Sequence, residues 1–410
     1  MSDRASERHH HRLLAVVPFL SFCLMTIPCH AQNRDVLCTN GSGKFEAEFP
    51  TGVKLRVGAA KNAAKELATR VCEATLNWNQ QELAVATNTA ELDVDVFGAD
   101  LGLGMPVVAF QVKKSAAECC MAYEIYSLQK PPRLLRTITG GNFFGASDTD
   151  LDGRVEIWTA DAAAVDGFEN VALGEFDFAP TVVLRFERGR LVDVSSEFLP
   201  YFDRQIRKLR AELDAQDLRD FKNSDSKFTS TASSVQELHR LRVVRIKVLE
   251  IVMAYLYSDR EQEAWRSLAE MWPASDVERI RAAILNARAH GIHAQVDGGS
   301  SGVPAGRKKH ALVFDTIGRS EGNKSEVIPA QAILLRRPAP LSSEGLPDSE
   351  LLLDLLIDSA GKVRSVEPAG NTKFPDADLI KAAMEWTFVP ALKDGRAVAS
   401  RLRLAVSTKR

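Results

Sequence analysis

The sequence predicts an α+β protein of several domains: a β-rich N-terminal domain, a helical middle bundle and a small C-terminal ββαβ module. Short runs between residues 32 and 192 alternate apolar and polar side chains with the period of two that is typical of strands. From residue 193 to residue 295 the period changes to 3.6, which indicates helices. Alternation returns in residues 346–410, around one helical segment. A chain of 410 residues has room for two or three such domains.

The first 31 residues have the organisation of an export signal. Arg4, Arg8 and Arg12 form a basic start, residues 13–27 carry no charge, and Cys29 and Ala31 occupy the small-residue positions of a cleavage site. Cleavage after Ala31 would leave the mature chain in the periplasm or outside the cell. Because the apolar run is shorter than the roughly 20 residues that span a bilayer, a cleaved signal is favoured. The alternative is an uncleaved anchor in the inner membrane, with the rest of the chain facing the periplasm.

Composition gives no reason to expect nucleic-acid binding, because the formal net charge is only −2. Export would place the protein in an oxidising compartment, which favours disulfides, and four cysteines remain after cleavage. The sequence predicts a Cys38–Cys72 disulfide, because adjacent cysteines such as Cys119 and Cys120 rarely bond to each other without strain. Cys119 and Cys120 are therefore predicted to be buried thiols on opposite faces of one strand.

Residues 32–192 are predicted to be mostly strand. Apolar and β-branched residues alternate or cluster in FEAEF, VKLRV, LDVDVF, MPVVAFQV and YEIYSL, between Gly, Pro and Asn breaks. One helix is predicted at about residues 59–76, from the spacing of Ala63, Leu67, Val71 and Thr75. The stretch TVVLRFERGRLVDVS predicts a closing hairpin that turns at residues 187–189.

Residues 193–295 predict a bundle of about three helices, with a polar loop near residues 223–234. The predicted buried stripes are Phe198, Phe202, Ile206, Leu209 and Leu213; Leu238, Leu241, Val248, Val252 and Leu256; and Leu268, Val277, Ile280, Ile284 and Leu285. Residues 296–345 begin with the Gly/Ser/Pro-rich VDGGSSGVPAG and are predicted to be a linker. Short strand pieces are expected there at HALVF and AQAILL.

The last 65 or so residues are predicted to form a small sheet under one helix. LLLDLLID is a strand with Leu353, Leu355 and Ile357 on one face, and SAGK turns the chain into an antiparallel partner. Asp376 or Asp378 can cap a helix that buries Leu379, Ala382, Ala383 and Trp386. FVPALKDGR is expected to be a connector. The final strand is expected at an open sheet edge, and its residues are Val398, Ser400, Leu402, Leu404 and Val406.

The motifs IDSAGKV and DADLIKAAMEWTFVPALKDGRAVASRLRLAVS resemble the TonB C-terminal domain, over residues 346–410. The shared features follow one order, which is Gly361, Asp378, Trp386, Phe388, Pro390 and Gly395. The resemblance implies that the module binds a periplasmic segment of a TonB-dependent outer-membrane transporter. Binding would occur by strand addition to the final strand. The chain departs from the family pattern in two respects: it lacks the usual Tyr-Pro before the first strand, and it lacks a long Pro-rich spacer.

These features lead to the expectation of an exported cell-envelope protein that binds a partner protein through its C-terminal module. The alternative is a membrane-anchored energy transducer of the TonB type, which would power outer-membrane transport. The two differ at the N-terminus, because an anchor has to persist for force to be transmitted.

The segment SDTDLDGRVEIW carries a second pattern, with Asp148, Asp150 and Asp152 at alternate positions, Gly153 next and Glu156 at position nine. Carboxylates at positions one, three, five and nine and a glycine for the tight turn are typical of calcium loops. Position twelve is Thr159, so the helix–loop–helix calcium pattern is excluded. Together with the preceding GGNFFG, residues 140–158 resemble the calcium loop of FG-GAP repeats. The alternative is an acidic surface turn held by its own hydrogen bonds.

No enzyme motif stands in a plausible setting. Residues 298–302 satisfy G-x-S-x-G, but they lie in the predicted linker, whereas a nucleophile elbow needs a strand before it and a helix after it. The four histidines outside the signal, His239, His290, His293 and His310, have no nucleophile motif nearby. The sequence therefore predicts a protein that is not an enzyme.

Overall fold

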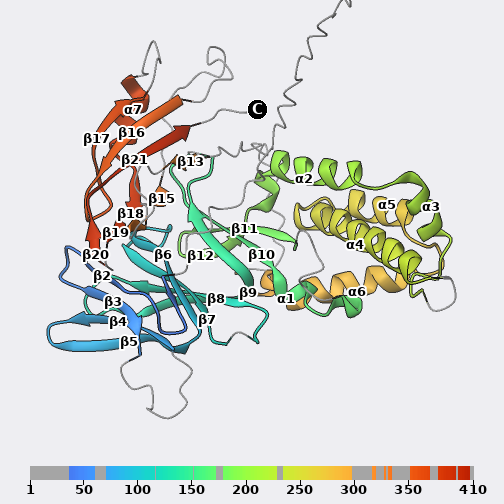
Figure 1. The fold of residues 1–410 in the computed structure, drawn as a ribbon, viewed down its shortest axis with the longest axis horizontal. Coiled ribbons are helices and arrows are strands. Elements are labelled where there is room, and N and C mark those ends of the chain that lie inside the picture. The colour runs from blue at the N-terminus through green and yellow to red at the C-terminus, as the bar shows by residue number, and fades with distance from the viewer. Residues whose placement is uncertain are drawn as a thin grey trace, which may run out of the picture. The chain divides into compact units, whose positions relative to one another are not determined.

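The computed structural model describes residues 37–60, 71–115, 117–150, 152–171, 179–228, 234–297, 316–319, 327–328, 331–334, 351–369, 377–393 and 396–406. The predicted signal in residues 1–31 lies outside this set. The chain is a mixed α+β protein with long antiparallel sheets and several helices, which confirms the α+β class of the prediction (Figure 1). In the described residues, no helix has both the length and the apolar character needed to cross a membrane.

An eight-stranded antiparallel sheet carries the site described below. Its strands, in spatial order, are β1 (Cys38–Thr39), β6 (Glu91–Ala99), β7 (Val107–Lys113), β8 (Met121–Ser127), β9 (Leu134–Ser147), β10 (Glu156–Asp161), β11 (Thr181–Glu187) and β12 (Arg190–Asp193). Arg188 and Gly189 have φ angles of 52° and 79° between β11 and β12. Positive φ at both central residues is the signature of a tight two-residue hairpin, so the predicted turn is confirmed.

A second sheet includes β2 (Phe45–Glu48), β3 (Lys54–Ala59), β4 (Cys72–Trp78) and β5 (Gln81–Thr89). The helix predicted over residues 59–76 is wrong at both ends, which belong to β3 and β4, while residues 61–70 lie outside the described set. Cys72, Ala74 and Leu76 are all fully buried, which is the period of a strand rather than a helix. The predicted Cys38–Cys72 disulfide is present and joins β1 of the first sheet to β4 of the second.

The described residues of the helical region form five α-helices rather than about three: α2 (Leu199–Ala211), α3 (Ala215–Lys222), α4 (Val235–Tyr257), α5 (Glu261–Met271) and α6 (Val277–His290). The predicted third stripe is divided between α5 and α6 because Pro273 follows α5 and stops it. The long α4 contacts α2, α3 and α5 (Figure 1). One hydrophobic cluster includes Ile157 and Leu184 of the sheet together with Leu249 and Ile284 of the helices. The sheet and the helices therefore share one core.

Asp161 lies at the junction of these elements. Its carboxylate is fully buried and accepts hydrogen bonds from the Tyr257 hydroxyl at 2.9 Å and from the backbone N–H groups of Ile292 and Ala164 at 3.1 and 3.3 Å. It therefore joins the end of β10 to α1 (Ala162–Val165), to α4 and to the short helix η4 (Ile292–Gln295). A Cβ atom at Gly291 would lie 2.1 Å from Asp161 Oδ2, so only glycine fits at that position.

The C-terminal module contains a four-stranded antiparallel sheet in the order β13-β21-β16-β17, with helix α7 (Ala377–Ala383). The strands are β13 (Thr316–Arg319), β16 (Leu351–Ile357), β17 (Val363–Pro368) and β21 (Ser400–Val406). The predicted buried residues Leu353, Leu355, Ile357, Leu379 and Trp386 form one cluster with Phe388 and Leu404. This core confirms the predicted strand and helix faces.

Two expectations for the module are wrong. The expected connector contains β18 (Thr387–Val389), β19 (Ala391–Lys393) and β20 (Arg396–Val398), and β18 pairs with β15 (Gln331–Leu334). β19 pairs with β14 (Val327–Ile328), and β20 forms the parallel pair Glu46↔Arg396 with β2. The final strand is not a sheet edge, since β13 pairs with it from Arg403 to Val406. A strand contributed from about 85 residues earlier in the chain is invisible to local sequence patterns.

Candidate metal centre

The loop between β9 and β10 folds around the carboxylate of Asp148. Asp148 Oδ1 accepts a hydrogen bond from the backbone N–H of Asp152 at 2.9 Å, and Oδ2 accepts one from that of Gly153 at 2.8 Å. Gly153 has a φ of 88°, in the left-handed region that glycine adopts without strain. The alternating Asp pattern and the glycine thus produce a tight turn that is closed by its own first residue.

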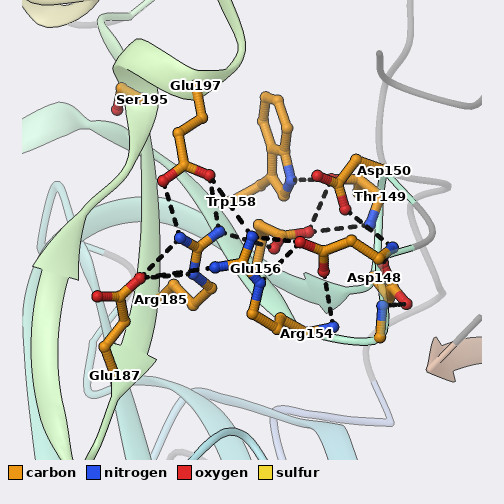
Figure 2. Close-up of polar contacts among 12 residues, drawn as sticks. Asp148, Thr149, Asp150, Arg154, Glu156, Trp158, Arg185, Glu187, Ser195 and Glu197 are labelled. Atoms are coloured by element: carbon orange, nitrogen blue, oxygen red, sulfur yellow. Dashed lines mark hydrogen bonds and ion pairs between the residues drawn. The ribbon is translucent and has the colours of Figure 1, made fainter. Parts of the chain in front are cut away.

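Three carboxylates converge in this loop. Asp148, Asp150 and Glu156 each offer one oxygen, and these oxygens lie within 4.8 Å of one another (Figure 2). Asp148 is 1% exposed and Glu156 is 0% exposed. Glu156 Oε2 accepts hydrogen bonds from the backbone N–H and the hydroxyl of Thr149, at 3.0 and 3.1 Å. Glu156 Oε1 is buried and accepts no hydrogen bond from any described residue.

Asp152 does not join this group, although the sequence predicts it as a ligand. Its Oδ2 accepts a hydrogen bond from Nε of Arg154 at 2.7 Å and another from Nη2 of the same side chain. Its Oδ1 accepts one from the backbone N–H of Arg154 at 2.9 Å. The arginine two residues later therefore holds the third aspartate away from the other three carboxylates.

The electrostatics of the loop oppose three ionised carboxylates. Burial raises the pKa of Asp148 to about 8, and the charges of Asp150 and Asp152 add to this effect. Burial raises the pKa of Glu156 to about 8 as well, again with help from Asp150. The pKa of Asp150 is also raised, by burial and by Asp152. Burial would raise the pKa of Asp152 too, but its bonds with Arg154 outweigh burial and lower it.

Arg185 of β11 is the buried cation beside the loop. It lies directly opposite Glu156 in the strand register and is 1% exposed. Its guanidinium donates two hydrogen bonds to Glu197, of 3.0 and 2.8 Å, and two to Glu187, of 2.7 and 3.3 Å (Figure 2). Burial alone would lower the pKa of Arg185, but these two glutamates raise it above its ordinary value. Two other carboxylates therefore share most of its positive charge.

Trp158 connects the loop to the helical region. Its indole N–H donates to the Thr149 hydroxyl at 3.1 Å, and Thr149 in turn binds Glu156. The ring packs edge-on against Phe198 and Tyr201, with centroid distances of 5.1 and 4.9 Å. Phe198 directly precedes α2 and Tyr201 lies in its first turn. The position of the loop is thus fixed relative to the start of α2.

This arrangement suits a hard divalent cation. All three converging groups are carboxylate oxygens, the donors that calcium prefers. The buried Glu156 Oε1 lies 3.5 Å from Arg185 Nη1 but accepts no hydrogen bond from any described residue, and a bound cation would satisfy it. A cation would also favour the ionised forms that burial now disfavours. The predicted position of the loop between two strands is confirmed by β9 and β10.

The other predicted site residues have different settings. Val398 ends β20, while Ser400, Leu402, Leu404 and Val406 belong to β21, which lies between β13 and β16. Leu402 and Leu404 are buried in the module core. Cys119 and Cys120 are not buried thiols, because they form a disulfide with each other. The roles of Arg185, Glu197 and Trp158 were not predicted, and the one local signal was an arginine inside the apolar run TVVLRF.

No protein-family model matches this chain, and neither the curated proteins nor the solved structures contain a match. Its function has to be inferred from its own residues.

Proposed function

We propose that this chain is an exported cell-envelope protein that binds calcium in the β9–β10 loop and a partner protein through its TonB-like module. The observation that carries the calcium proposal is the convergence of the Asp148, Asp150 and Glu156 carboxylates, in which the buried Glu156 Oε1 accepts no hydrogen bond from the described residues. Two disulfides support export, since disulfides persist in oxidising compartments.

Charge accounting favours a bound cation. Asp148, Asp150, Asp152 and Glu156 carry four potential negative charges in nine residues, and Arg154 and Arg185 are the cations that contact them. Arg154 binds Asp152, and Arg185 mainly binds Glu187 and Glu197. Of the three converging carboxylates, Glu156 has an ion-pair contact of 3.5 Å with Arg185, and it shares that guanidinium with Glu187 and Glu197. Calcium would neutralise the three converging carboxylates and hold both strand ends in place.

Calorimetric titration of the full chain with calcium chloride, after chelator treatment, tests this role. We expect one site, lost in Asp148→Asn and in Glu156→Gln. Asp152→Asn should keep most of the affinity because its carboxylate is committed to Arg154. Asp166→Asn changes the charge equally at an exposed position outside the loop and is the matched control. The absence of calcium heat in the unmodified protein would disprove the calcium role.

Partner binding is proposed for the free side of β17. In the described part of the chain, β17 pairs only with β16, and an extended peptide could add to its other side. A peptide from the periplasmic segment of a TonB-dependent transporter is the probe. We expect it to slow amide hydrogen exchange in residues 363–368 and to leave β21 unchanged. Equal exchange with and without the peptide would count against this docking mode.

The alternative role as an energy transducer depends on the fate of residues 1–31. N-terminal sequencing and cell fractionation of the native protein distinguish the two. A chain that begins near Gln32 in the soluble periplasmic fraction supports the exported binding protein. An intact Met1 in the inner membrane would favour the transducer.

A further inference from the structure

The two disulfides of this protein have opposite surroundings. Cys38 and Cys72 are both 0% exposed and lie in a hydrophobic cluster between two sheets. Cys119 and Cys120 are neighbours in the chain, lie in the turn between β7 and β8, and are both partly exposed. A thiol in solution can therefore reach Cys119–Cys120 in the folded protein, while Cys38–Cys72 stays buried.

The Cys119–Cys120 disulfide forms part of the wall of a hollow of 320 Å³. Strands β7, β8 and β9 supply the rest of the wall, through Val112, Met121, Ala122, Thr139 and Gly140. Lys114 and Glu118 bring one positive and one negative charge to the same hollow. Both cysteines line this space, which is large enough to admit a small thiol.

The chemistry of disulfide exchange fits this position. Exchange begins when a thiolate attacks one sulfur, and the other sulfur leaves as a thiolate. A nearby ammonium group stabilises thiolates, and Lys114 lines the hollow beside the cysteines. The Cys38–Cys72 pair is fully buried in an apolar cluster and offers a dissolved thiol no access in the folded protein.

We infer that Cys119–Cys120 is a thiol–disulfide exchange site whose substrate is a dithiol. The first thiolate of the dithiol attacks Sγ of one cysteine, which breaks the Cys119–Cys120 bond and forms a mixed disulfide. The second thiolate of the reagent then displaces that cysteine. The reagent leaves as a disulfide, and Cys119 and Cys120 gain two electrons and two protons in total.

The Cys119–Cys120 disulfide should contribute little to the stability of the fold. It closes a loop between adjacent residues, whereas Cys38–Cys72 spans 34 residues. The stabilisation from loop closure grows with loop length. Reduction of Cys119–Cys120 should therefore leave the fold intact, which a reversible exchange site requires.

Graded reduction of the oxidised full chain tests the assignment. The folded protein is incubated with dithiothreitol, alkylated with iodoacetamide and analysed by peptide mass spectrometry. We expect Cys119 and Cys120 to be labelled at a reductant concentration at least roughly tenfold below that needed for Cys38 and Cys72. Circular dichroism should stay unchanged at the first step. A second arm with reduced thioredoxin, at equal dithiol concentration, shows whether a small or a protein dithiol reacts faster.

Three results would overturn the proposal: labelling of Cys119 and Cys120 before any reductant is added, simultaneous labelling of all four cysteines, or labelling only after unfolding. The variant with both Cys119→Ser and Cys120→Ser should lose the early labelling and keep the late one. Lys114→Gln should slow the first step at low ionic strength, with the difference reduced by added salt. An unchanged rate in Lys114→Gln would contradict the role of the lysine.

Discussion

Glu156 and Arg185 face each other across β10 and β11 with 3.5 Å between Oε1 and Nη1, yet no hydrogen bond joins these two atoms. The guanidinium makes its shorter contacts with Glu187 and Glu197. Glu156 therefore keeps one buried oxygen without a hydrogen bond from any described residue, while its carboxylate lies beside those of Asp148 and Asp150. Glu156 belongs to the candidate metal centre, and Arg185 connects Glu156 to the helical region through its hydrogen bonds with Glu197.

Removal of the Arg185 charge should be strongly destabilising. Above about pH 8, where Glu156 is ionised, Arg185→Met leaves this buried carboxylate without its nearby cation, and breaking a buried pair in this way typically costs about 3–5 kcal/mol. Arg154→Met is the matched control, since its side chain is 52% exposed and such pairs contribute less than about 1 kcal/mol. Denaturant unfolding in the presence of a chelator measures both. Equal losses in the two variants would contradict the central role of Arg185.

Calcium-free protein should lose stability as the pH rises from about 4 to about 8. The folded-state pKa values of Asp148 and Glu156 are raised to about 8, above unfolded values near 4. Between these pH values the folded state binds more protons than the unfolded state. The cost of ionising the two buried carboxylates is therefore absent below about pH 4 and complete above about pH 8. Unfolding at several pH values, compared with the variant Asp148→Asn and Glu156→Gln, isolates the effect.

Calcium should reverse this trend, because it binds the ionised carboxylates and releases their protons. Its stabilising effect should therefore increase toward pH 8 in the unmodified protein and be absent in the double variant. A calcium effect that weakens as the pH rises would disprove this coupling.

Asp276 should stabilise the helical region in a pH-dependent way. Burial would raise its pKa, but hydrogen bonds from Arg279, Trp272 and Ser226 outweigh burial and lower the pKa to about 2. Its stabilisation, about 2 kcal/mol, should be complete above pH 4 and lost as the pH falls through about 2. Asp276→Asn should thus be destabilising at pH 7 and nearly neutral near pH 2. Unfolding curves at both pH values would show whether the difference persists.

Loss of the Cys38–Cys72 disulfide should cost about 4 kcal/mol, as expected for a loop of this length. The variant with Cys38→Ala and Cys72→Ala is compared with the variant with Cys119→Ser and Cys120→Ser. The second should show a much smaller loss, because its loop joins adjacent residues. Comparable unfolding free energies for the two variants would argue against this division of roles.

The position of β21 inside its sheet can be tested by hydrogen exchange. Ile317→Pro removes one backbone N–H from β13 and should disturb its pairing with β21. We expect faster exchange for a subset of amides in residues 403–406 and no change in residues 353–357. Ile317→Val keeps strand propensity and is the control. If the amide exchange rates in β21 are the same with and without Ile317→Pro, β13 does not protect β21.

Local patterns predicted the features that depend on local geometry. The alternation at Leu353, Leu355 and Ile357 identified a buried strand face, and the Arg188-Gly189 pair identified a hairpin. The aspartate spacing placed the acidic loop between two strands because the turn is closed by its own backbone. These signals need no knowledge of distant residues.

Features that depend on distant pairing were missed. Residues 59–76 have helical spacing at Leu67, Val71 and Thr75, but strand pairing of β4 with β3 and β5 decided the outcome. Arg185 lies 29 positions after Glu156 and faces it only because β10 pairs with β11. Neither β13 beside β21 nor the Asp152–Arg154 pairing has a distinctive sequence signature.

Asp161 and Gly291 lie 130 positions apart in the chain. A carboxylate oxygen of Asp161 nevertheless occupies the space that a Cβ atom at position 291 would need. Tyr257 completes the set through its hydroxyl. Loss of the Tyr257 hydroxyl removes one of three donors to a buried carboxylate, loss of Asp161 leaves those donors without their acceptor, and a side chain at Gly291 clashes with Asp161. In homologous sequences these three positions should therefore vary as a set, and their covariation would identify members of the same lineage even where overall identity is too low to do so.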